Sequence, residues 1–229
     1  MKVLAFDTET TGLPENMNAP MTDSSKWPHI IQLSFILFDT EQKEILEYSD
    51  RIIKLPGTIA ISPISISIHK ITRERSESEG IYIRQALLEF TEAIKDADVI
   101  IAHNIAFDKK MILAELSRQH LPNCFVRANT YNEPEPIVEY CTMKETIDIC
   151  KIPNPVTKYA DKYKWPRLNE LHKHLFHTEP TGTHNAIADV MICLRSYIYL
   201  TCNYDIAVDE DVKMVFRCLY ANYCGGAAH

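Results

Sequence analysis

Short apolar runs, each ended by polar residues, predict four β-strands in the first half of the chain. These runs cover residues 3–6, 30–38, 44–54 and 99–102. The second run becomes wholly apolar after its first residues, which is typical of a strand inside a sheet. A polar turn follows it and leads into the third run, so these two strands are expected to form a hairpin or a meander.

Apolar residues at helical spacing predict five α-helices. The expected helices cover residues 83–97, 107–119, 168–176, 185–201 and 209–223. Strands that alternate with helices in this way indicate an α/β fold.

Three long segments show neither period clearly. Residues 14–28 read as a loop, and residues 55–80 as irregular structure with a charged stretch. Prolines interrupt residues 121–167, where a strand near 137–143 and a short helix near 147–152 are expected.

Composition limits the classes of protein that the chain can belong to. Its 229 residues, 46% hydrophobic and 24% charged, fit one large domain or two small ones of a globular protein. The net charge of −7 argues against a protein that coats duplex DNA, since such proteins are usually basic. Contact with nucleic acid would therefore be local or would involve metal ions.

The cysteines and the apolar runs bear on where the protein works. Seven cysteines, an odd number without a C-x-x-C pair, favour free thiols in a reducing compartment. The apolar run after Lys2 stops at Asp7, so no signal peptide is expected, and no run approaches the ~18 residues of a membrane helix. We expect an intracellular, soluble protein that does not contact a membrane and is not secreted. It would work in the cytoplasm or nucleus, or be virus-encoded and made in a host cell.

Two carboxylates, Asp7 and Glu9, end the first apolar run. Residues two apart in a strand point to the same face, with Cα atoms about 6.6 Å apart. Clustered carboxylates need a partner, and hard cations such as Mg²⁺ are the usual one. The alternative is that both acids form a turn at an exposed strand end.

Further candidates follow later in the chain. Asp108 begins the helix after the strand at 99–102, where α/β folds place ligand-binding groups, although it could be a helix cap only. Asp189 lies in the helix at 185–201, for which Thr183 is a suitable N-cap. His184 is about 140° from Asp189 around a helix, so it faces the same site only if it lies on the entering loop. Most of the other histidines read as structural or surface groups, and the cluster of His172, His174 and His177 reads as a solvated face in preference to a zinc site.

Three segments match, in order, the exonuclease motifs of the DEDDh 3′–5′ exonucleases, and over residues 1–202 the chain resembles this family. The segments are Asp7-Thr8-Glu9, Asn104 to Asp108, and His184 with Asp189. The family includes the epsilon proofreading subunit of DNA polymerase III. The histidine branch fits better than the tyrosine branch, because Asn185 stands four residues before Asp189. Residues 203–229 depart from the epsilon subunit and are expected to be a helical extension on or beside the same domain.

The resemblance implies a ribonuclease H-like fold, with a mixed five-stranded sheet flanked by helices, and two divalent ions, Mg²⁺ or Mn²⁺. Asp7 would bridge both ions, Glu9 and Asp189 would hold the first, and Asp108 would bind the second. His184 would act as the general base. The chemistry agrees, because carboxylates suit these ions and an imidazole with a pKa near ~6.5 can take a proton from the attacking water.

The resemblance also suggests residues that contact the substrate: Thr8, Leu13, His69, Asn104 and Phe107. Leu13 would pack against the terminal base, with Asn104 and Phe107 in the same pocket, and His69 would belong to a loop that holds the 3′ nucleotide. Core packing remains an alternative for Leu13 and Phe107. The basic and aromatic segment 158–167 reads as a strand-binding surface or, preferably, as a packed turn.

The leading hypothesis is a metal-dependent 3′–5′ exonuclease on single-stranded 3′ ends that releases nucleoside 5′-monophosphates. DNA is favoured because the residues of the first motif, from Asp7 to Leu13, look more like those of the family members that act on DNA. Proofreading or DNA repair, with a DNA polymerase as a candidate partner, would fit. The alternatives are an RNA-trimming exoribonuclease of the same fold and a non-catalytic, polymerase-associated subunit that binds nucleic acid.

Overall fold

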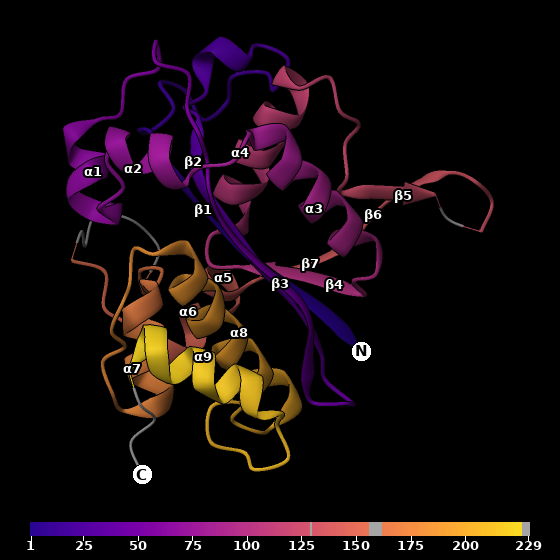
Figure 1. Ribbon diagram of the computed structural model, residues 1–229. Coiled ribbons are helices and arrows are strands. Elements are labelled where there is room, and N and C mark those ends of the chain that lie inside the picture. Colours follow the sequence, from indigo (N-terminus) through magenta and orange to yellow (C-terminus); the bar gives the residue numbers. More distant parts are fainter. Residues whose placement is uncertain (129, 156–161, 226–229) are drawn as a thin grey trace.

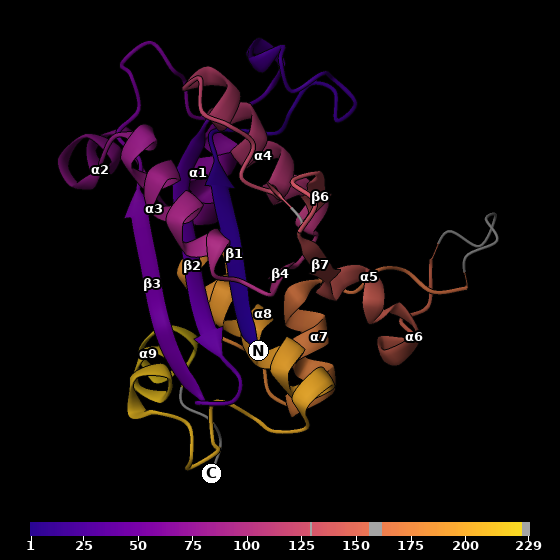
Figure 2. The same cartoon turned by 90° about the vertical axis from the view of Figure 1, so that its right-hand side faces the viewer.

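The computed structural model describes residues 1–128, 130–155 and 162–225. Its centre is a mixed sheet with the strand order β3-β2-β1-β4-β7 (Figures 1 and 2). The strands are β1 (Lys2–Thr10), β2 (Ile30–Asp39), β3 (Glu44–Ile52), β4 (Val99–Ala102) and β7 (Val138–Cys141). Strands β1, β2 and β3 pair antiparallel, as the predicted hairpin requires, whereas β4 is parallel to both β1 and β7. The predicted mixed five-stranded α/β fold is confirmed.

Helices cover both faces of the sheet, and the alternation of side chains along β1 divides the core between them. Leu4 and Phe6 pack in the cluster that includes α3 (Ile83–Lys95) and α4 (Ile105–Arg118). Val3 and Ala5 pack in the cluster of the opposite face, which includes α8 (Ala186–Cys202) and α9 (Met214–Cys224). Helix α7 (Leu168–Phe176) has the predicted bounds, and it packs beside α8.

Two short helices lie in the segment 55–80, for which irregular structure was predicted. They are α1 (Pro63–His69) and α2 (Arg73–Glu79). Pro63 occupies the first turn of α1, where its missing N–H costs nothing, and Thr72 caps α2 by accepting from Arg75 N at 3.3 Å. Both helices are too short, and α2 too polar, to show an apolar period, so the prediction was wrong here.

The last helix begins later than predicted, at Met214 instead of residue 209. Asp205 and Asp209 accept hydrogen bonds from the backbone N–H groups of residues two positions on, Ala207 (3.0 Å) and Asp211 (2.9 Å). Such bonds form turns that compete with a helix. Residues 206–224 still contribute buried side chains to the core beneath α8, including Ile206, Phe216 and Tyr220.

The segment 121–167 holds the smaller elements. Strand β7, followed by α5 (Thr142–Glu145), and α6 (Ile147–Cys150) lie where a strand and a short helix were expected. Strands β5 (Val126–Ala128) and β6 (Pro134–Pro136) form a separate ribbon that projects from the body (Figure 1). A 3-10 turn, η1 (Ser24–Lys26), lies in the predicted loop 14–28.

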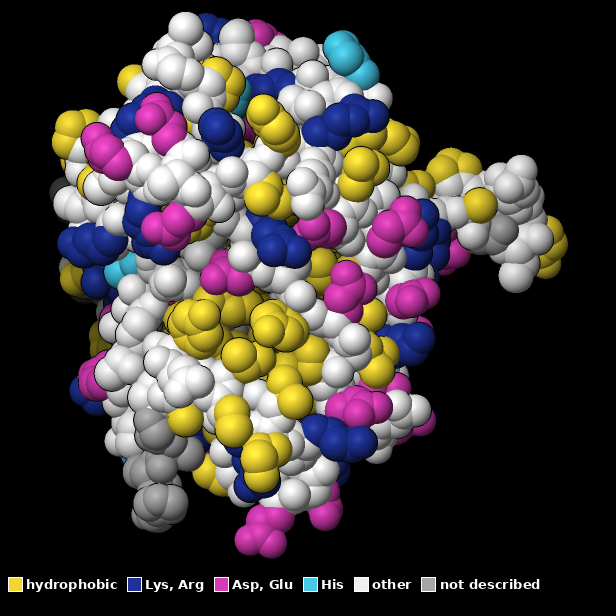
Figure 3. Space-filling model, viewed as in Figure 1, with side chains coloured by type: hydrophobic (Ala, Val, Ile, Leu, Met, Phe, Trp, Pro, Cys, Tyr) yellow, Lys and Arg dark blue, Asp and Glu magenta, His cyan; other side chains and the backbone are white. Residues whose placement is uncertain are grey.

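The surface and the cysteines agree with the composition. Figure 3 shows acidic and basic side chains interspersed on one face, with hydrophobic side chains gathered near β3 and α9. All seven cysteines are free thiols. Among the described residues, no helix is both long enough and apolar enough to cross a bilayer.

Candidate functional site

The alternation along β1 places both early acids on the face of the sheet that α8 covers. Asp7 and Glu9 continue the series of Val3 and Ala5, and they meet Asp189 from the first turn of α8. One potential ligand oxygen from each acid lies within 4.8 Å of the other two. Within the described part of the chain, this is the one grouping of three or more His, Cys, Asp or Glu close enough to share a metal ion.

Helix α8 is held at its start so that Asp189 meets the strand. Asn185 is the N-cap, and its side chain accepts from Ile187 N at 3.3 Å, so Thr183 was the wrong prediction for this cap. Ala186 N donates to Gln32 Oε1 of β2 at 3.3 Å, which ties the helix to the sheet. A hydrogen bond to a side chain of β2 thus fixes the start of α8. Local sequence does not show this contact, because the two residues are far apart in the chain.

Asp108 reaches the acidic cluster from the other face. Its helix α4 starts at Ile105, earlier than predicted, because Asn104 takes the left-handed conformation (φ 72°) and serves as the N-cap. Asp108 is buried, and its Oδ1 accepts from Thr8 N at 3.0 Å and from Thr8 Oγ1 at 2.8 Å. Thr8 therefore anchors Asp108 at the end of β1.

His184 lies on the loop before α8, so the helical angle does not separate it from Asp189. Its backbone is left-handed (φ 68°), and its N–H donates to Asp189 Oδ2 at 3.0 Å. The side chain is exposed and lines a cavity of about 600 Å³ together with Asp7 and Asp189. We call this cavity the acidic cleft.

Burial without counter-charge raises the pKa of every acid in the cluster. Desolvation is the largest cause for all four, and neighbouring carboxylates add to it at Asp7, Glu9 and Asp108. The pKa of Glu9 rises to about 8, those of Asp108 and Asp189 rise to about 7, and that of Asp7 lies well above its ordinary value. The hydrogen bonds from Thr8 and from His184 N partly oppose the rise at Asp108 and Asp189.

This donor set fits a divalent cation. Hard cations such as Mg²⁺ and Mn²⁺ prefer carboxylate oxygens, and a cation would relieve the repulsion that the raised pKa values express. The carboxylates of Asp7, Glu9 and Asp189 would hold such an ion, with Asp108 near enough to raise the pKa values of Asp7 and Glu9.

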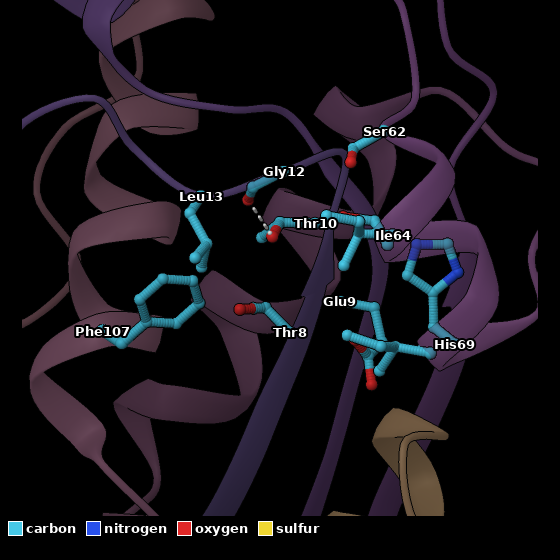
Figure 4. A pocket seen from close by; sticks show the side chains of 11 residues that line it. Thr8, Glu9, Thr10, Gly12, Leu13, Ser62, Ile64, His69 and Phe107 are labelled. Carbon is cyan, nitrogen blue, oxygen red and sulfur yellow. Dashed lines mark hydrogen bonds between the residues drawn. The ribbon is translucent and has the colours of Figure 1, made fainter.

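A second cavity, of about 420 Å³, adjoins the cluster on the side of Glu9 and is mostly apolar. We call it the apolar pocket. In Figure 4, Leu13 and Phe107 lie on one side of it and His69 on the other, with Thr8 and Glu9 between them. Leu13 is 84% exposed, so its side chain is not part of the core.

Asn104 does not share this pocket, contrary to the prediction. It lines the acidic cleft, while Phe107 lines the apolar pocket.

His69 is buried at the wall of the apolar pocket. Its Nδ1 accepts from Ile71 N at 3.0 Å, which leaves the proton of the neutral ring on Nε2. Burial lowers the pKa of His69, so the ring is neutral. Nε2 faces the Thr10 carbonyl but makes no hydrogen bond of regular geometry within the described residues.

Of two further residues of the acidic cleft, the sequence pattern missed His103 and included Trp165 only within the segment 158–167. His103 and Trp165 both line it, the first from the end of β4 and the second from the loop before α7. The position of His103 directly after a buried strand was an available signal. Within the segment 158–167, Lys158 and Tyr159 lie outside the described residues, so the strand-binding hypothesis is considered below for Trp165.

The histidines of α7 correct one prediction. His172 is buried instead of solvated: its Nδ1 donates to the Thr178 carbonyl at 2.9 Å, and its Nε2 lies 2.7 Å from Tyr220 Oη. It therefore connects α7 with α9 and with the loop that leads to His184.

Comparison with known proteins gives a family and a fold. The profile of the exonuclease family matches residues 4–197. No curated protein matches the chain. Among solved structures, exonuclease I, in the structure that suggests how its processivity is achieved, has a TM-score of 0.64 and 15% identity, covering 87% of this chain and 41% of that chain.

Two E. coli structures of the same enzyme carry ligands. Exonuclease I in complex with a dA16 oligonucleotide has a TM-score of 0.62 and 16% identity, covering 87% of this chain and 41% of that chain. The zinc-bound form of the complex with single-stranded DNA has a TM-score of 0.60 and 16% identity, covering 87% and 40%. At these identities the likeness shows the fold, and the chain spans less than half the length of exonuclease I.

Proposed function

Because the chain belongs to the exonuclease family, with the motif residues of its DEDDh branch, we propose that it is a metal-dependent 3′–5′ exonuclease acting on single-stranded DNA ends. It hydrolyses phosphodiester bonds and releases nucleoside 5′-monophosphates. The observation that carries the proposal is the meeting of Asp7, Glu9 and Asp189, from two elements, beside a cleft that His184 also lines.

Four carboxylates would hold two divalent ions, Mg²⁺ or Mn²⁺. Asp7 lies centrally, Glu9 and Asp189 complete one set of donors, and Asp108 serves the second ion. Two such ions supply charge neutralisation at the phosphate and a more acidic attacking water. The raised pKa values support this assignment, because they show how strongly the site favours an added positive charge.

His184 would act as the general base. Its side chain is exposed to the acidic cleft, where water can reach it, and its backbone is held by Asp189. A neutral imidazole accepts the proton of the attacking water near neutral pH, a task for which an ordinary carboxylate is too weak a base.

The apolar pocket would take the terminal nucleotide. Leu13 and Phe107 offer apolar surface for a base, and the neutral ring of His69 stands at the opposite wall. We favour DNA because the similar exonuclease I structures contain DNA oligonucleotides. Thr8 and Asn104 remain proposed substrate contacts, each at the wall of one cavity.

The test is a time course on 5′-labelled single-stranded DNA and RNA of equal length, with Mg²⁺ or Mn²⁺. We expect the DNA to shorten from its 3′ end faster than the RNA. Asp7→Asn and His184→Ala should each abolish most of the activity, whereas His174→Ala, which changes an exposed histidine of α7, should not.

The contrary outcomes discriminate between the alternatives. Faster shortening of RNA would assign the enzyme to RNA trimming. No product from either strand, with Mn²⁺ uptake in calorimetry, would favour a non-catalytic subunit. A proofreading or repair role is a further proposal, which pull-down of a DNA polymerase by the full chain would support.

A further inference from the structure

An exposed tryptophan stands at the acidic cleft. Trp165 is 56% exposed, although an indole is among the side chains that gain most from burial. It lines the same cavity as Asp7, His184 and Asp189. Its place beside these residues suggests a ligand with a flat apolar surface.

The backbone on both sides of Trp165 is held firmly. Before it, Lys164 N donates to the Ile152 carbonyl at 2.9 Å, and Lys164 Nζ lies 2.6 Å and 2.7 Å from the two carboxylate oxygens of Glu170. After it, the side chain of Pro166 is buried. The exposed indole therefore projects from a fixed segment, and ordering it for a ligand costs little.

His103 holds the backbone on the C-terminal side of Trp165. Its Nε2 donates to the Pro166 carbonyl at 3.1 Å, and its Nδ1 accepts from Thr142 Oγ1 at 3.0 Å. Burial lowers the pKa of His103 to about 4, so the ring is neutral and has one donor and one acceptor to match these partners. This histidine, at the end of β4, connects the loop of Trp165 to the sheet.

The two cavities lie on different sides of the acidic cluster. Glu9 lines the apolar pocket, while Asp7 and Asp189 line the acidic cleft. A strand whose terminal nucleotide fills the apolar pocket places its scissile phosphate at the acids, and its next nucleotides then pass the acidic cleft. Exposed aromatic side chains beside such a path bind bases by stacking, whatever the base.

We propose that Trp165 is a stacking platform for a second nucleobase of the bound strand, upstream of the terminal one, and that His103 positions it through Pro166. This inference rests on the proposed function, since it takes a nucleic-acid strand as the substrate. Arg167, exposed at the same cleft, supplies a positive charge near the phosphates of that segment.

The test measures binding without hydrolysis. Full-length protein carrying Asp7→Asn is titrated with a 12-nucleotide single-stranded DNA in Mg²⁺, and intrinsic fluorescence and anisotropy of a 5′ label are recorded. Trp27, the other tryptophan, is 3% exposed and donates to the Pro20 carbonyl at 3.3 Å, so quenching reports on Trp165. Stacking should quench this fluorescence.

Substitutions separate stacking from general effects on the surface. Trp165→Ala should weaken binding about tenfold, and Trp165→Phe should stay within about threefold while losing the quench. Tyr82→Ala, which removes an exposed aromatic side chain from another cavity, is the matched control and should leave Kd unchanged. DNA binding with no quench and an unchanged Kd in Trp165→Ala would overturn the proposal.

Oligonucleotides with a single abasic position locate the base. The effect of Trp165→Ala should persist when the terminal base is absent and vanish when one upstream base is absent. Loss of the effect only with the terminal abasic site would overturn the assignment to a second base. Quenching by a protein whose wild type does not hydrolyse DNA would refute the proposed function alone, and absence of any DNA binding would refute both.

Discussion

In the absence of divalent ions, the protein is expected to lose stability as the pH rises above neutrality. Desolvation and the charges of Asp189 and Asp108 raise the pKa of folded Glu9 from 4.5 to about 8. A group with a higher pKa in the folded state binds its proton more tightly there. Its contribution to stability is complete below pH 4.5 and is lost as the pH rises through about 8.

The size of the expected loss of stability follows from the pH interval between the unfolded and the folded pKa of Glu9. Each pH unit between the unfolded and folded pKa values costs about 1.4 kcal/mol for one carboxyl. From pH ~6.5 to ~8, Glu9 alone therefore costs on the order of 2 kcal/mol, and Asp108 and Asp189 act in the same direction up to about 7. In a domain of this size that lowers Tm by about 6 °C.

Thermal unfolding in EDTA measures this effect, and Glu9→Gln, which keeps the buried histidines, separates it from their contribution. Burial lowers the folded pKa values of His69, His103 and His172 from 6.5, so the unfolded state binds more protons at these sites near pH ~6.5, and their contribution to stability rises with pH, opposite to that of the acids. Relative to Glu9→Gln, wild type should lose about 6 °C of Tm between pH ~6.5 and ~8, and excess Mg²⁺ should raise the Tm of wild type at pH ~8.

The control changes an acid outside the cluster. Asp148→Asn, on the exposed side of α6, should keep the slope of wild type. An equal slope of Tm against pH in wild type and in Glu9→Gln would refute the reasoning that the acids are mutually destabilising without ions.

Three further predictions concern the apolar pocket, the His184 loop and the ion pair between Arg195 and Asp205. Leu13→Ala should raise KM for single-stranded DNA several-fold with Tm unchanged, because Leu13 is 84% exposed; an unchanged KM would show that the pocket does not hold the base. Gly182→Ala should lower kcat more than it raises KM, because it displaces the loop that carries His184. Gly182 has φ +73°, and a Cβ there would lie 2.1 Å from the Tyr223 carbonyl oxygen of α9. Kinetics like those of wild type would contradict this. Arg195→Met should lower the free energy of unfolding in urea by about 3–5 kcal/mol, because the carboxylate of Asp205, 2.6 Å from Arg195 Nη2 in wild type, loses its partner. A decrease of less than about 1 kcal/mol would contradict this prediction.

Short-range sequence patterns were enough to predict several features of the fold and of the candidate site. The period of two in a strand places Asp7 and Glu9 on one face without any knowledge of what covers that face. Apolar spacing located α3, α4, α7 and α8, because α3, α4 and α8 bury apolar side chains against the sheet and α7 buries its own against α8. Where elements bury little or are very short, as in α1 and α2, no such stripe exists and the pattern was silent.

The sequence by itself determined which side chains are the candidates for the chemistry, since residue type and local period fix the acids of β1 and the order of the motifs. The tertiary structure decided how they meet. The bond from Ala186 N to Gln32 set the start of α8, the left-handed backbone of His184 aimed its N–H at Asp189, and His103 held the loop of Trp165. These contacts join residues from separate elements, and their energies depend on burial and distance, which exist only once the chain has folded.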